Sequence, residues 1–167
     1  MRFCDEQDFG FGWLDDEDPL RRASHALVVD GGVWLIDPFA WQEAEARART
    51  LGEPRGVVQL LDRHERDCAA TAERLGVPLH RVPTGKLDGA PFELLAVASN
   101  RFWRESAFWW PERRVLVVAD ALGISCALFF VTDFLFRSPV PALVTALVAG
   151  TIALSWYGLP LFRKATD

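Results

Sequence analysis

The chain has 167 residues, enough for one domain with a substantial core, and 50% of them are hydrophobic. Its formal net charge of −5 argues against nucleic acid as a partner, because phosphate contacts need clustered Lys and Arg. Three scattered cysteines, Cys4, Cys68 and Cys126, form neither a disulfide framework nor a zinc knuckle, and they favour a reducing compartment.

The first 24 residues are acidic, with glycine and aromatic residues interleaved, and we expect irregular or edge structure there. The clearest local signal follows, where two β-rich runs, 26–29 and 33–36, flank Asp30-Gly31-Gly32. Asp-Gly between apolar runs predicts a β-hairpin, because glycine accepts the positive φ that tight turns need.

Helices and strands then alternate along the chain. Residues 41–54 predict a helix that Gly52 and Pro54 stop, and residues 56–62 predict a strand. A second helix is expected over 66–76, with Gly76 as its C-cap. Four further strands are expected over 79–83, 92–98, 105–110 and 113–120, the last two as a hairpin. This order predicts a mixed α/β domain in which helices cover sheets and loops at strand ends carry any site.

The C-terminal part has a different composition. The net negative charge arises before Val115, and residues 138–162 contain no charged residue. An uncharged run longer than about 18 residues is typical of a transmembrane helix. The flanking Arg163-Lys164 suits a cytoplasmic side. We therefore expect a domain over 1–120, an apolar, transmembrane two-helix hairpin over 121–163 and a polar tail over 164–167.

This division predicts a membrane protein whose N-terminal domain is cytoplasmic. Membrane lipid would be contacted through the C-terminal hairpin, whose words "FFVTDFLF" and "WYGLPLFRK" resemble the last spans of small bacterial integral-membrane proteins. The alternative is that the apolar runs are buried core helices of a cytoplasmic protein.

One loop, "LLDRHERDC" at 60–68, concentrates groups that bind metals. A zinc site needs several His, Asp, Glu or Cys ligands, and a hydrolytic site leaves one position open for water. A mononuclear site would combine His64, Asp67 and Cys68 of this loop with the distant Asp120. The alternative is structural: Asp67 caps the following helix, and Cys68 packs inward as a small apolar residue.

The order of elements and several local words resemble the N-terminal half of the metallo-β-lactamase fold, over roughly residues 24–123. "WLIDP" resembles the acid-containing turn that ends the opening hairpin of that family. "VVQLLDRHERDCAATAERLGVP" has the layout of its metal loop, H-x-H-x-D-H, between a strand and a helix. "SAFWWPERRVLVVADALG" resembles its later hairpin followed by a Gly-Asp-Ala-Leu segment.

This resemblance implies a partial αββα fold and a degenerate metal motif. Asp67 matches the aspartate of the motif, and Asp120 matches the bridging aspartate. Arg63, Glu65 and Cys68 fall on the three histidine positions, with His64 out of register by one. Arginine at a ligand position repels a cation.

Three functional hypotheses follow. The first is a non-catalytic binding or structural module attached to the membrane, with no cofactor and no assignable catalytic residue. In that case a protein partner or a second copy of the chain would cover the exposed sheet. The second is a zinc-dependent hydrolase with an unusual ligand set. The third is a fusion or frameshift product, joined near Gly123, without a function of its own.

Overall fold

The computed structural model describes residues 1–18, 23–64, 66–88 and 90–120. The predicted hairpin over 121–163 and the tail over 164–167 lie outside these residues, so the predicted domain boundaries stay predictions. Within the described ranges, no helix is long and apolar enough to cross a membrane.

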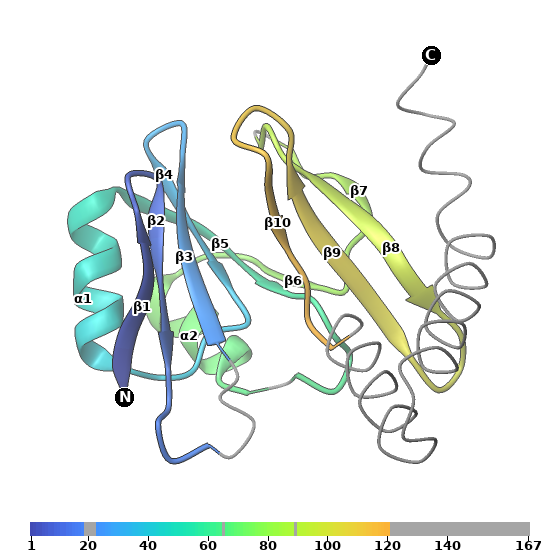
Figure 1. Ribbon diagram of the computed structural model, residues 1–167, viewed down its shortest axis with the longest axis horizontal. Coiled ribbons are helices and arrows are strands. Elements are labelled where there is room, and N and C mark those ends of the chain that lie inside the picture. The colour runs from blue at the N-terminus through green and yellow to red at the C-terminus, as the bar shows by residue number, and fades with distance from the viewer. Residues whose placement is uncertain (19–22, 65, 89, 121–167) are drawn as a thin grey trace, which may run out of the picture.

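Two β-sheets pack face to face, and two helices cover one face of the larger sheet (Figure 1). The six-stranded sheet has the order β1-β2-β3-β4-β5-β6, and the smaller sheet has the order β10-β9-β8-β7. The strands of the larger sheet are β1 (Arg2–Gln7), β2 (Gly10–Leu14), β3 (Ala23–Val29), β4 (Gly32–Ile36), β5 (Glu53–Gln59) and β6 (Leu79–Arg81). The remaining elements are α1 (Gln42–Leu51), α2 (Cys68–Leu75), β7 (Gly85–Lys86), β8 (Glu93–Ser99), β9 (Arg104–Trp110) and β10 (Val115–Val117).

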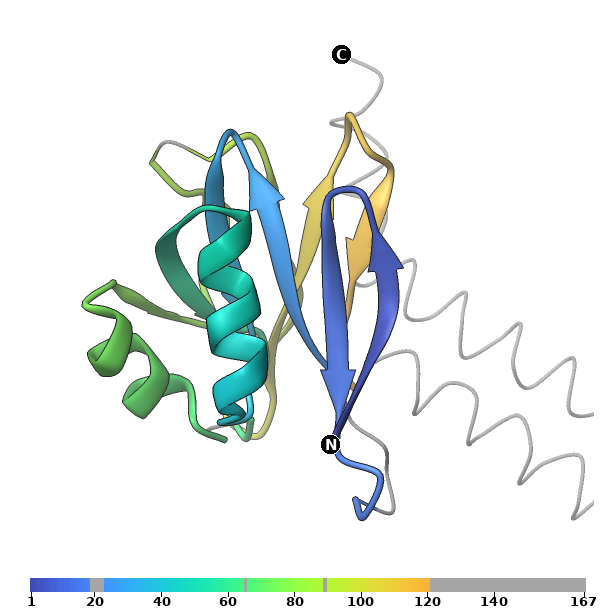
Figure 2. The same cartoon turned by 90° about the vertical axis from the view of Figure 1, so that its left-hand side faces the viewer.

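Strand β4 explains how the layers are held together, because both of its faces are buried. Val33 and Leu35 pack with residues of α1 and α2, whereas Trp34 and Ile36 pack with the smaller sheet. A strand buried on both faces reads as a continuous apolar run, as "GVWLI" does. Figure 2 shows α1 lying over the six-stranded sheet, on the side away from the smaller sheet.

The hairpin and helix-end predictions are confirmed. β3 and β4 pair antiparallel up to Val29 and Gly32, and the connecting Asp30 and Gly31 have φ values of 49° and 74°. Positive φ values at both central residues are typical of a tight two-residue hairpin turn. Helix α2 ends at Gly76, whose φ of 68° is left-handed, as predicted.

The N-terminal prediction of irregular or edge structure is confirmed for β1, which is the edge strand of the larger sheet. It is wrong for β2, which forms a hairpin with β1 and also pairs with β3 inside the sheet. Glycine normally weakens a strand, so the segment "GFGWL" does not predict a strand. Packing overrides this propensity, because Phe11 and Trp13 are 2% and 1% exposed in the core beneath the helices.

The fold class is thus mixed α/β, with two sheets and two short helices. The described residues build three layers in the order α, β, β, and they contain no helix on the far side of the smaller sheet. The second helical layer of the expected αββα arrangement is therefore not seen among the described residues.

Candidate functional site

The loop between β5 and α2 is fixed to the smaller sheet. Ser106 donates its backbone N–H to the Leu60 carbonyl at 2.8 Å, and Asp62 donates its own to the Arg104 carbonyl at 3.0 Å. The Asp62 carboxylate in turn accepts the Arg104 N–H at 3.1 Å. These bonds join the end of β5 to the start of β9, so the loop sits where the two sheets meet.

Asp37 fixes the other side of this loop. It follows β4, is 4% exposed, and its Oδ1 accepts the Leu60 N–H at 2.9 Å. Its Oδ2 lies 3.2 Å from Nδ1 of His64. Its carbonyl accepts the Ser24 hydroxyl at 2.7 Å. The φ of 45° at Asp37 is left-handed, a conformation that aspartate tolerates better than most residues.

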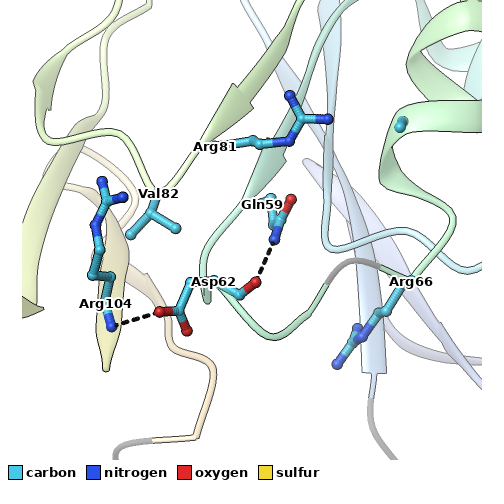
Figure 3. Close-up of a pocket in the computed structure, with 7 residues that line it drawn as sticks. Gln59, Asp62, Arg66, Arg81, Val82 and Arg104 are labelled. Atoms are coloured by element: carbon cyan, nitrogen blue, oxygen red, sulfur yellow. Dashed lines mark hydrogen bonds between the residues drawn. The ribbon is translucent and has the colours of Figure 1, made fainter. Parts of the chain in front are cut away.

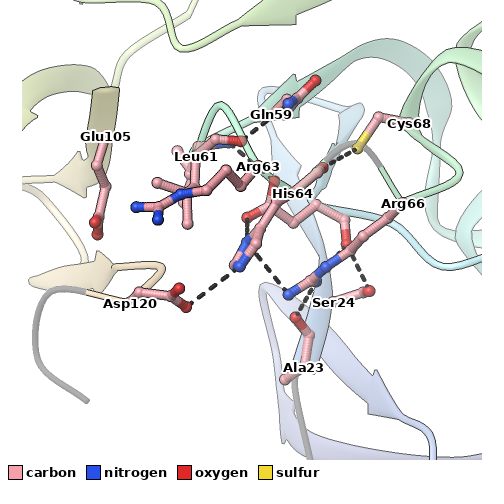
Figure 4. Close-up of polar contacts among 12 residues, drawn as sticks. Ala23, Ser24, Gln59, Leu61, Arg63, His64, Arg66, Cys68, Glu105 and Asp120 are labelled. Atoms are coloured by element: carbon pink, nitrogen blue, oxygen red, sulfur yellow. Dashed lines mark hydrogen bonds and ion pairs between the residues drawn. The ribbon is translucent and has the colours of Figure 1, made fainter. Parts of the chain in front are cut away.

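His64 lies between two carboxylates (Figure 4). Its side chain is 7% exposed, with Nδ1 facing Asp37 and Nε2 lying 3.2 Å from Oδ1 of Asp120. Asp120 follows β10, and its side chain is 45% exposed. Both ring nitrogens of His64 are therefore within 3.2 Å of a carboxylate oxygen.

Arg66 brings a permanent positive charge to the same cluster. Its Nη1 donates to the carbonyls of Ala23 and Asp37 at 2.9 and 2.8 Å. Its Nη2 lies 3.3 Å from Nδ1 of His64, and its guanidinium carbon lies 4.4 Å from the ring centroid of Phe39. The guanidinium is therefore oriented by backbone carbonyls and by an aromatic face.

A small hollow of about 100 Å³ lies beside this cluster. Asp37, His64, Arg66 and Asp120 line it together with His25, whose pKa is lowered by burial. A water molecule takes up about 30 Å³ of liquid, so the hollow suits a few waters rather than a large substrate.

The four predicted metal ligands do not converge on one point. His64 and Asp120 meet, but Oδ2 of Asp67 accepts the Ala40 N–H at 2.7 Å. Asp67 occupies the N-cap position of α2, as predicted, but its side chain makes no hydrogen bond to that helix. The Cys68 thiol donates to the His64 carbonyl at 3.6 Å, and burial raises its pKa to about 12.

These positions do not fit a zinc centre. Zinc takes three or four deprotonated protein ligands, and in the part of the chain that is described no group of three or more His, Cys, Asp or Glu could hold a metal. The Cys68 thiol is directed at the His64 carbonyl, and among the described residues the His64–Asp120 pair is the only pair of predicted ligands that meets. The four-residue set stays a prediction that a metal measurement tests.

Sequence reasoning missed two residues that organise the cluster, Asp37 and Arg66. Asp37 had a signal, because the acid in "WLIDP" closes an apolar strand. No sequence signal indicated Arg66, because it resembles any other charged residue of a solvent-exposed turn. Its partners, Ala23 and Asp37, lie 43 and 29 positions away in the chain.

Comparisons with known proteins find similarity among solved structures alone. No family model matches the sequence, and no curated protein matches it. Among solved structures, the chain is similar to the metallo-beta-lactamase DIM-1, crystallised after exposure to ceftazidime, with a TM-score of 0.47 and 10% identity. The match covers 69% of this chain and 67% of that one. No residue role is transferred from this similarity.

Replacing Asp37 tests its structural role. Asp37→Ala removes the acceptor of the Leu60 N–H and of His64 Nδ1, so we expect the free energy of unfolding to fall by about 2–4 kcal/mol. Asp120→Ala is the matched control and should cost less than about 1 kcal/mol, because Asp120 is partly exposed. Urea unfolding followed by tryptophan fluorescence measures both. Equal losses in the two variants would contradict the role assigned to Asp37.

Thiol reactivity tests the state of Cys68. Because burial raises the pKa of the Cys68 thiol to about 12, the thiol is protonated at pH 8 and is a poor nucleophile there. We expect iodoacetamide to label Cys68 slowly in the folded protein and rapidly in urea, as followed by peptide mass spectrometry. Fast labelling of the folded protein that added zinc suppresses would instead show a metal-binding thiolate.

Proposed function

We propose that this chain is a metallo-β-lactamase-like binding module that performs no metal-dependent hydrolysis and is attached to the membrane by its C-terminal segment. The observation that carries the proposal is the guanidinium of Arg66, held 3.3 Å from His64 by two backbone carbonyls. A fixed cation takes part in the cluster in which the resemblance implies a metal.

Electrostatics supports this reading. The Arg66 charge does not titrate in the physiological range, and a divalent ion beside His64 would face it across a few ångströms. Asp37 already supplies a negative charge at this site, and it contacts His64, the Leu60 N–H and Arg66. Asp37, His64 and Arg66 therefore make polar contacts with one another without a metal.

One observation favours the hydrolase alternative. A histidine that bonds a carboxylate through Nδ1 and presents Nε2 to a second group has the orientation of many zinc ligands, and His64 has it between Asp37 and Asp120. Because these supply two ligands at most, the remaining ligands would have to come from another chain.

Membrane attachment rests on the sequence. The uncharged run at 138–162 and the basic Arg163-Lys164 after it support insertion, with the folded domain on the cytoplasmic side. A fusion or frameshift origin near Gly123 is the competing explanation for this tail, and the DNA sequence around that codon decides between them.

Zinc content tests the proposal against the hydrolase. After dialysis against zinc and then buffer, we expect less than about 0.2 zinc per chain by elemental mass spectrometry, because hydrolysis of this type needs a bound metal. About one zinc per chain, lost in His64→Ala but kept in His80→Ala, would overturn the proposal. His80 is a matched control because it stacks on Trp34, with ring centroids 5.8 Å apart, and does not line the cluster.

Alkaline carbonate extraction tests membrane attachment. We expect the full-length chain to stay with the membrane pellet. Leu147→Arg with Leu154→Arg should shift it toward the supernatant, because each arginine at the centre of a span costs about 2.5–3.5 kcal/mol. The corresponding double alanine variant is the control and should stay in the pellet. Release of the unmodified chain would remove membrane attachment from the proposal.

A further inference from the structure

A second, larger hollow opens on the other side of the loop that carries His64. It has a volume of about 330 Å³ and lies around Gln59 and Asp62 (Figure 3). Three arginines, Arg66, Arg81 and Arg104, line it. Its volume falls at the lower end of the range of small-molecule sites.

The hollow lies where parallel strands end. Gln59 is the last residue of β5 and Arg81 the last residue of β6, and these two strands pair in parallel. Arg104 begins β9 of the facing sheet. The carboxyl ends of neighbouring parallel strands are a common position for ligands in α/β proteins.

Charge is the most informative property of this hollow. Three arginines and a single carboxylate line it, in a chain whose net charge is −5. The Oδ2 atom of that carboxylate, on Asp62, already accepts the Arg104 N–H. Among the described residues, the guanidiniums of Arg81 and Arg104 make no ion pair. Arg81 and Arg104 therefore bring two positive charges to one hollow without an ion pair among the described residues, and an anion between them relieves their repulsion.

Helix α2 adds to the same field. Ala69, in its first turn, lines the hollow, and no side chain caps this end of the helix. The free N–H groups and the positive end of the helix dipole favour a negative ligand there.

The backbone at the rim is strained. Val82, which follows Arg81 and lines the hollow, has a φ of 44°, a rare value for a β-branched residue. Its N–H bond to the Gln59 carbonyl at 2.8 Å holds this conformation. Strain of this kind gathers at ligand sites, where the surrounding structure enforces it.

We propose that this hollow binds a small oxyanion, the phosphate or carboxylate group of a soluble ligand, through Arg81 and Arg104. The inference rests on the proposed function in taking the domain as a binding module, and it names the class of ligand. It does not depend on the metal question, because Arg81 and Arg104 do not line the His64 cluster.

Calorimetric titration of the full-length protein with inorganic phosphate, and separately with malonate, tests the proposal. We expect saturable binding of at least one probe, weakening as salt is added. Arg81→Gln with Arg104→Gln should weaken binding at least about tenfold, because it removes two charge-assisted contacts. Arg49→Gln, an exposed arginine in the last turn of α1, is the charge-matched control and should bind as the unmodified protein does.

The outcomes separate the sources of the anion. Binding of phosphate alone identifies a phosphorylated ligand, binding of malonate alone identifies a carboxylic acid, and binding of both supports a general oxyanion site. Binding of neither, or equal binding by the double variant and the Arg49→Gln control, overturns the proposal. A zinc content near one per chain would refute the proposed function while leaving this titration unaffected.

Discussion

The carboxylate of Asp37 is the contact on which the arrangement around His64 depends. It stands at the end of β4, almost fully buried, and its two oxygens reach the backbone of Leu60 and the ring of His64. Its carbonyl is bonded by Ser24 and by Arg66. One residue thus ties the ends of three neighbouring strands to the loop before α2, and a buried carboxylate is stable only because so many donors surround it.

The sequence predicted the elements that local chemistry controls. The Asp30-Gly31 turn and the left-handed Gly76 were found because few other residues adopt those backbone angles at low cost. It missed β2, where the burial of Phe11 and Trp13 outweighs the poor strand propensity of the intervening glycines. It also missed the cluster around Arg66, because those contacts join segments far apart in the chain and no local pattern encodes them.

Arginine has two different surroundings in this domain. Arg66 is bonded to carbonyls and stacked on Phe39, so its charge serves the architecture of the loop. Arg81 and Arg104 are exposed at strand ends and make no ion pair within the described ranges. A guanidinium that is oriented by the backbone is a structural cation, whereas one that faces solvent beside others of its kind is available to an anionic ligand.

The position of Asp120 has a consequence for the order of folding. The β3–β4 hairpin closes over a two-residue turn, and the parallel β4–β5 pair needs only the α1 crossover between them. The contact between His64 and Asp120, in contrast, closes a loop that contains the whole smaller sheet. Because long loops close at a greater entropic cost, the larger sheet can assemble first, and the cluster is completed only when β10 docks. The arginine-lined hollow can therefore form before the hollow beside His64, because its lining residues end at Arg104 in β9.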